Sequence, residues 1–214
     1  MPPRRVLDPL ERASEIVFGL LMVLTFTGSI DVAMGGREEV GTILLAALGC
    51  NMAWGIVDAA MYLMTSFSQR SRGAATMAAV RRAGEPAVAS ALIRAALPDP
   101  LGEAIGDVEV EALRRRVCQM PEPGNAARLR RDDLVGAAAT FLLVFLSTFP
   151  VVIPFLIVDR VATALRLSHG VAIVMLFAAG WSAGAHAGTG RLRSGLAMVG
   201  LGLVLASVTI ALGG

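Results

Sequence analysis

The sequence predicts an all-α integral membrane protein of five transmembrane helices, with a small cytosolic helical segment between helices two and three. Hydrophobic residues make up 55% of the 214 residues and charged residues only 17%. Several apolar stretches reach about 20 residues, which is the length that a helix needs to cross a bilayer. A soluble domain of this size could not bury all of them, so lipid is expected to cover them.

The first two predicted spans are joined by a short polar turn. Ile16–Met34 is apolar except for Asp31, and Gly41–Phe67 is apolar except for Asp58. Residues 35–39, which contain two glycines and three charged residues, form the turn. Two antiparallel helices are therefore expected at the N-terminus.

The last three predicted spans contain no aspartate, glutamate or arginine. They are Leu134–Val158, Ser168–Gly188 and Ser194–Gly213. As helices rising about 1.5 Å per residue, each is long enough to cross the hydrocarbon core.

The segment between spans two and three has a different character. It is rich in arginine and in helix-forming residues, and Pro98, Pro100, Pro121 and Pro123 punctuate it. Ala74–Leu97 and Leu101–Cys118 are rich in helix formers, and we predict two or three short helices in this segment. The expected organisation is residues 1–67 with spans one and two, residues 68–133 as the cytosolic segment, and residues 134–214 with the remaining spans.

The arginines predict the orientation. All 19 basic residues are arginine, and sixteen of them lie before span one, in the middle segment or between spans four and five. Only Arg37, Arg160 and Arg166 lie on the opposite side. By the positive-inside rule, the N-terminus is cytosolic and the C-terminus lies outside, in a multi-pass protein of the cell inner membrane. Arginines at span ends, without a basic stripe and interleaved aromatic residues, argue against nucleic-acid binding.

Asp58 is the strongest functional signal, because a carboxylate inside a span costs about 2.5–3.5 kcal/mol on insertion scales. Helical spacing places Asn51, Gly55 and Tyr62 on roughly the same face. This face either lines a pathway for a cation or proton, or holds an aspartate that is hydrogen-bonded to a neighbouring helix. No nucleophile with an oriented base occurs in any span, so we expect no enzyme activity.

A second candidate is an acidic row in the middle segment. Glu103, Asp107 and Glu111 recur every four residues. On one helix face they could gather a hard cation, or they could simply form a solvated face.

The order of spans and two local motifs resemble the vacuolar iron transporter family. Members have two spans, a cytosolic helical domain and three more spans. Phe145–Phe155, with its small residues and Pro150 and Pro154, is similar to the family's third span. Gly180–Leu196 is similar to the junction of its fourth and fifth spans.

This resemblance implies a homodimer that exports a divalent cation of the iron or manganese class from the cytosol in exchange for protons, without a resident cofactor. The implied pathway lies near the first two spans, where Met22 stands at the position of a family aspartate and Asn51 at that of a glutamate. Asp58 is adjacent to the position of a family methionine. The candidate pathway residues are Asp58, Asn51, Met22 and Tyr62. The alternative is a non-transporting membrane scaffold or sensor whose cytosolic helices bind a partner.

Overall fold

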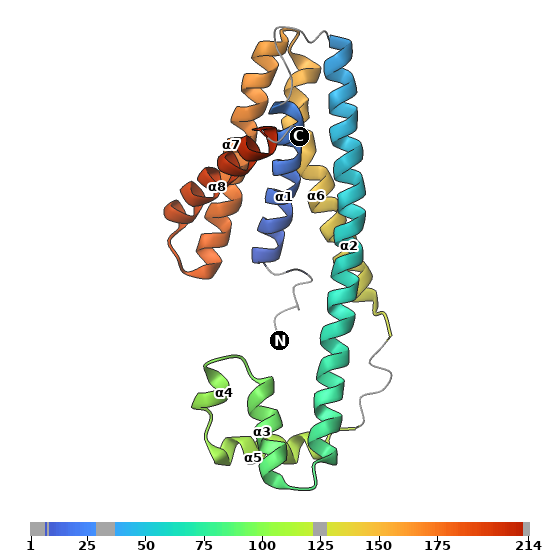
Figure 1. Ribbon diagram of the computed structural model, residues 1–214, viewed down its shortest axis with the longest axis vertical. Coiled ribbons are helices and arrows are strands. Elements are labelled where there is room, and N and C mark those ends of the chain that lie inside the picture. Colours follow the sequence, from blue (N-terminus) through green and yellow to red (C-terminus); the bar gives the residue numbers. More distant parts are fainter. Residues whose placement is uncertain (1–6, 8, 29–36, 122–127, 212–214) are drawn as a thin grey trace. The chain divides into compact units, whose positions relative to one another are not determined.

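The computed structural model describes residue 7 and residues 9–28, 37–121 and 128–211. The regular elements in these ranges are all helices (Figure 1). They are α1 (Pro9–Gly28), α2 (Arg37–Arg82), α3 (Pro86–Ala96), α4 (Leu101–Ala104), α5 (Asp107–Gln119), α6 (Arg131–Ile157), α7 (Val161–Ala187) and α8 (Arg191–Ala211).

Four of the described helices, α2, α6, α7 and α8, are long and apolar enough to cross a membrane. The chain is therefore a multi-pass membrane protein. Helix α1 differs because Glu11, Arg12 and Glu15 occupy its first two turns. The apolar part that remains, Ile16–Gly28, is shorter than the roughly 20 residues of a complete span. The predicted end of span one, including Asp31, lies outside the described residues.

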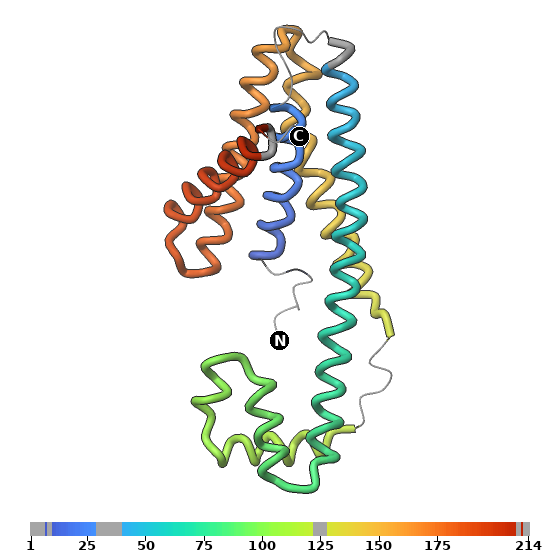
Figure 2. The backbone as a smooth tube through the Cα atoms, viewed as in Figure 1, coloured from blue at the N-terminus to red at the C-terminus, as the bar shows by residue number. Residues whose placement is uncertain are grey.

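The chain divides into two compact units. Met1–Leu63 and Arg131–Gly214 form the first, here named the bundle unit, and Met64–Arg130 forms the small unit. The division falls within α2, which continues without a break into the small unit (Figure 2).

Helix α1 lies at the centre of the bundle unit, where it packs against α6, α7 and α8 (Figure 1). Its side chains Leu20 and Val23 are fully buried. They join a core that includes Val151 of α6 and Leu176 of α7. A helix enclosed in this way is covered by protein rather than lipid, so its apolar residues are buried on several sides.

Helices α7 and α8 form a tight hairpin. The turn contains Gly188 and Gly190, whose φ values of 70° and 86° lie in the left-handed region that favours glycine. A Cβ atom at Gly180 would lie 2.6 Å from the carbonyl oxygen of Ser194, and one at Gly184 would lie 2.5 Å from the Ser194 side chain. The glycines Gly180 and Gly184 therefore allow α7 to pack closely against α8 within one chain.

The stretch Ala74–Leu97, which is rich in helix formers, is divided between two helices. Helix α2 ends at Arg82, and α3 begins at Pro86 after a short break. Pro86 lacks an amide hydrogen and biases the preceding residue towards extended backbone. Glu85 indeed has φ −113° and ψ 134°, and Gly84 lowers the cost of leaving the helix.

The stretch Leu101–Cys118 is also divided, because Ile105 and Gly106 separate α4 from α5. Helices α3, α4 and α5 agree with the prediction of two or three short helices. The guanidinium of Arg94 donates to the carbonyl oxygens of Gly102, at 3.3 Å, and Ile105, at 2.5 Å. It also pairs with Asp107 at 2.7 Å. One side chain of α3 thus supplies the partners that a continuous helix would otherwise provide.

A second arginine holds the far end of α5. Arg81, near the end of α2, donates from Nε to the carbonyl oxygen of Val117 at 2.9 Å and from a terminal nitrogen to that of Met120 at 2.6 Å. These are carbonyl groups that the end of a helix leaves without partners, and a cation there also interacts favourably with the helix dipole. The small unit has a core of Val80, Ala89, Ile93 and Val110.

The close approach of α7 and α8 predicts the outcome of two leucine substitutions on α7. Gly184→Leu forces a side chain into Ser194 and should lower the free energy of unfolding by about 1–3 kcal/mol. Gly170→Leu is the matched control, because a Cβ atom there meets nothing within 4 Å. Thermal unfolding of the purified variants in detergent should separate them. Equal midpoints would contradict the tight hairpin.

Candidate functional site

Asn51 joins three helices of the bundle unit. Its side chain is fully buried on α2. The amide nitrogen donates to the carbonyl oxygen of Gly19 on α1 at 3.2 Å and to the hydroxyl of Thr148 on α6 at 2.5 Å. Buried polar groups need such partners, because an unpaired one costs about 1–3 kcal/mol. The position that the sequence singled out therefore binds α1, α2 and α6 together.

Two contacts fix how α1 and α2 lie against each other. Besides the Asn51–Gly19 hydrogen bond, the rings of Phe18 and Trp54 meet edge to face with centroids 5.6 Å apart. Residue numbers rise on α2 as they fall on α1, so the two helices are antiparallel. One turn beyond Trp54 comes Asp58, and one turn before Gly19 comes Glu15.

The contacts of Asn51 with Gly19 and of Phe18 with Trp54 bring Glu15 and Asp58 to the same level between α1 and α2, and the two are here named the carboxylate pair. Each is half-buried. The Oδ2 atom of Asp58 is buried and has no hydrogen-bond partner. Within the described residues, neither carboxylate takes part in a salt bridge or a hydrogen bond. Two acidic groups therefore lie inside the bundle unit without a described basic group to neutralise them.

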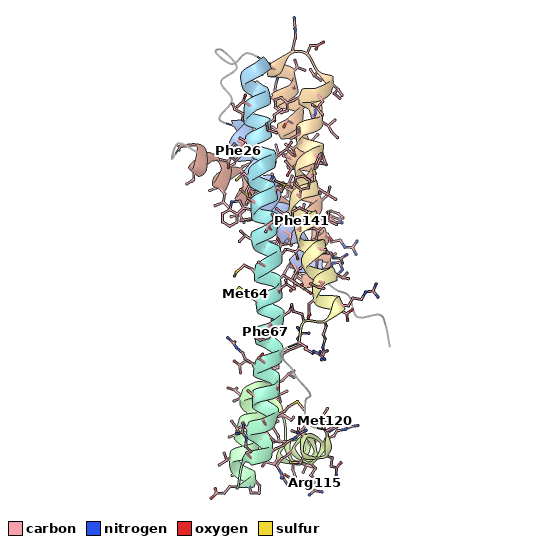
Figure 3. All side chains as sticks on the ribbon, turned by 90° about the vertical axis from the view of Figure 1, so that its right-hand side faces the viewer. Phe26, Met64, Phe67, Arg115, Met120 and Phe141 are labelled. Carbon is pink, nitrogen blue, oxygen red and sulfur yellow. The ribbon has the colours of Figure 1, made fainter. Side chains whose placement is uncertain are left out.

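Helix α6 covers the α2 face that carries Asp58. A Cβ atom at Gly55 would lie 2.9 Å from the ring of Phe141, which is labelled in Figure 3. Gly136 lies directly against the ring of Tyr62. The glycines allow this close approach because they carry no side chain, so Asp58 lies between two levels of α2–α6 contact.

The other predicted pathway residue, Met22, lies on α1 and is half-buried. It stands two turns beyond Glu15, or about 10 Å along the helix axis. Met61 and Met64 on α2 are more than half exposed, and Met64 projects from that helix in Figure 3. No thioether is thus brought to the carboxylate pair from these positions.

The predicted acidic row is not assembled in the structure. Glu103 lies on α4, whereas Asp107 and Glu111 lie on α5 beyond the break at Gly106. Asp107 pairs with Arg94, and Glu111 with Arg114 and Arg115 at 2.6 and 2.9 Å. These hydrogen bonds, with Arg114 first, lower the pKa of Glu111 to about 2. Across the described residues, no three acidic, histidine or cysteine side chains form a group that could hold a metal ion.

Glu15 is the residue that the sequence analysis missed. It stands one residue before Ile16, where the predicted first span begins, and so lies outside every predicted span. A usable signal was present, because Glu15 is four residues before Gly19 and shares its helix face. Only the packing of α1 against α2 places that face beside Asp58.

Two adjoining pockets of about 420 and 470 Å³ lie between α1, α6 and α7. Both have mainly apolar walls and include Arg12, Ile16 and Met175. Neither is lined by Glu15 or Asp58, so the pockets lie on a different side of α1 from the carboxylate pair.

The negative charge of the two carboxylates determines what the pair can bind. Two nearby carboxylates repel each other when both are ionised, and their burial makes ionisation costlier. A shared proton or a bound cation relieves both effects. The pair can therefore exchange one for the other.

Comparisons with protein-family models and with curated proteins give no match. The resemblance to vacuolar iron transporters accordingly stays a prediction based on the order of the spans and on two motifs.

The Asn51 contacts predict a loss of stability on substitution. Asn51→Leu removes both hydrogen bonds and leaves the Gly19 carbonyl and the Thr148 hydroxyl without this donor, which should cost about 1–3 kcal/mol. In Asn51→Leu/Thr148→Val the unpaired hydroxyl is gone, so the double variant should recover part of that loss. Chemical unfolding in mixed micelles can measure both. Strictly additive losses would argue against the Asn51–Thr148 interaction.

Proposed function

We propose that this chain is a membrane transporter that moves a divalent metal cation of the iron or manganese class out of the cytosol in exchange for protons. Its central group is the carboxylate pair of Glu15 and Asp58. The observation that carries the proposal is the buried Oδ2 atom of Asp58, which has no hydrogen-bond partner. The α1–α2 contacts bring this atom to the level of a second carboxylate, Glu15. Ionisable groups inside membrane helices characteristically mark ion pathways.

The exchange follows from competition for the same oxygens. A proton on the pair keeps the empty site neutral enough to remain inside the bundle. A divalent cation favours the ionised carboxylates and so displaces the proton. Cation and proton then cross in opposite directions through one site, and no separate coupling group is needed.

The proposed topology adds α1 as a fifth crossing. Its apolar face packs against α6, α7 and α8, which supports a position inside the membrane region. With the arginine distribution, the N-terminus and the small unit are cytosolic and the C-terminus is outside, in the cell inner membrane. The family resemblance further implies a homodimer.

The alternative function is a membrane scaffold or sensor, and one observation favours it. The small unit exposes large apolar side chains, including Val108 at 80% and Leu101 at 59%. Exposed apolar groups of this kind can bind a partner protein. A scaffold, however, would not need an unpaired buried carboxylate.

The proposed orientation can be tested on the two native cysteines. Cys118 is exposed on α5, whereas Cys50 is half-buried on α2. A membrane-impermeant thiol reagent should label Cys118 in inside-out vesicles but not in intact cells, and Cys50 should react only after denaturation. Labelling of Cys118 in intact cells would reverse the orientation.

Asp58→Asn tests the transport mechanism. The substitution keeps the shape of the side chain but removes its charge and its titration. In proteoliposomes, Mn²⁺-driven proton movement should fall to the level of empty vesicles, while thermal stability in detergent is retained.

The matched control is Asp132→Asn, which removes an exposed carboxylate at the start of α6 and should leave transport unchanged. If the Asp58→Asn variant transports like the parent protein, the proposed mechanism is wrong. If no divalent cation drives proton movement through the parent protein, the scaffold function takes its place.

A further inference from the structure

Thr140 on α6 is a buried hydroxyl without a partner. Its side chain is 1% exposed, and its Oγ1 atom makes no hydrogen bond. Threonines in helices usually satisfy this group by donating to the carbonyl oxygen one turn earlier. Thr25 and Thr27 on α1 do so, at 3.0 and 2.9 Å. Thr140 is therefore an exception that needs an explanation.

The neighbours of Thr140 on α6 show which way this face points. One turn earlier, Gly136 lies against Tyr62 of α2. One turn later, Val144 approaches α1, because a Cβ atom at Gly19 would lie 2.6 Å from the Val144 carbonyl oxygen. Residues four apart share a helix face, so Thr140 faces α1 and α2 as well.

The carboxylate pair lies at the same height along the helices as Thr140, as counting turns on α1 and α2 shows. Asp58 lies one turn from Tyr62 in the direction of Asn51, and Glu15 lies one turn before Gly19. Asn51 in turn contacts Thr148, two turns beyond Thr140 on α6. The three helices thus place the Thr140 hydroxyl at the level of Glu15 and Asp58.

We propose that the Thr140 hydroxyl is the third protein ligand of the cation that Glu15 and Asp58 bind, and that this all-oxygen set selects a hard divalent cation. The inference rests on the proposed function and adds the ligand from α6 and the class of cargo. Carboxylate and hydroxyl oxygens suit Mn²⁺ or Mg²⁺, whereas soft ions favour sulfur and imidazole ligands.

The described soft ligands lie elsewhere. Cys50 is more than two turns from Asp58 on α2, which is about 12 Å along the axis. His186 on α7 is exposed and hydrogen-bonded to the Ser182 carbonyl oxygen at 2.8 Å. Met61 is 54% exposed on α2. Waters can complete the coordination of a hard cation, as they do for Mg²⁺.

The test is Mn²⁺ binding to the purified full-length protein in lipid nanodiscs, measured by electron paramagnetic resonance of the free ion. Thr140→Val replaces the hydroxyl with a methyl group and should weaken Mn²⁺ binding about tenfold, which corresponds to about 1.4 kcal/mol of binding free energy. Thr140→Ser keeps the hydroxyl and should bind like the parent. Thr140→Cys should shift preference from Mn²⁺ towards Cd²⁺.

The matched control is Ser168→Ala. Ser168 is also fully buried with an unpartnered hydroxyl, but it lies near the start of α7. This variant should bind Mn²⁺ like the parent. Thr140→Ser and Thr140→Cys keep the experiment decisive if Thr140→Val does not fold.

The outcomes separate the two proposals. If Thr140→Val binds Mn²⁺ like the parent while Asp58→Asn does not, the role of Thr140 is wrong and the proposed function stands. Tighter binding of Cd²⁺ than of Mn²⁺ by the parent would overturn the hard-cation preference. If the parent binds neither ion, both proposals fail.

Discussion

The bundle unit depends on one constraint, which is that hydrocarbon offers no hydrogen-bond partner to a polar side chain. The amide nitrogen of Asn51 meets this constraint by donating to α1 and α6 at once, with the Gly19 carbonyl oxygen and the Thr148 hydroxyl as acceptors, whereas its buried Oδ1 atom has no hydrogen-bond partner among the described residues. These two bonds set the register of three helices. The level at which Glu15, Asp58 and Thr140 meet follows from that register, so a structural contact decides where the proposed ion site forms.

The central position of α1 explains how charged residues are accommodated. A helix with Glu15 beside its apolar run would expose that carboxylate if lipid surrounded it. Packing among α6, α7 and α8 with α2 alongside replaces lipid with protein. The same enclosure leaves Asp58 without a described basic partner, and a protein that needed only stability would place an arginine there or remove the carboxylate. The unpaired carboxylates are thus more readily explained by exchange of ions than by packing.

In the small unit, several charged side chains have partners, unlike Glu15 and Asp58 in the bundle unit. Water surrounds the small unit in the proposed topology. Arg94 and Arg81 each donate to carbonyl groups at the end of a short helix, and Glu111 pairs with two arginines. Two carboxylates that the sequence offered to a metal, Asp107 and Glu111, are thus paired with arginines. The difference between Glu111 and Asp58 is therefore one of partners, which residue spacing alone does not reveal.

The sequence by itself determined the helical membrane class and the approximate positions of α2, α6, α7 and α8, and it singled out Asn51 and Asp58 as polar residues within an apolar run. These follow from hydrophobic length and from the cost of a polar group in an apolar run, which are local properties of the chain. Only the tertiary structure decided the break at Gly106, the loss of the acidic row, and the meeting of Glu15 with Asp58. Each of these depends on which helices pack together, and contacts between residues far apart in the chain leave no periodic signal in it.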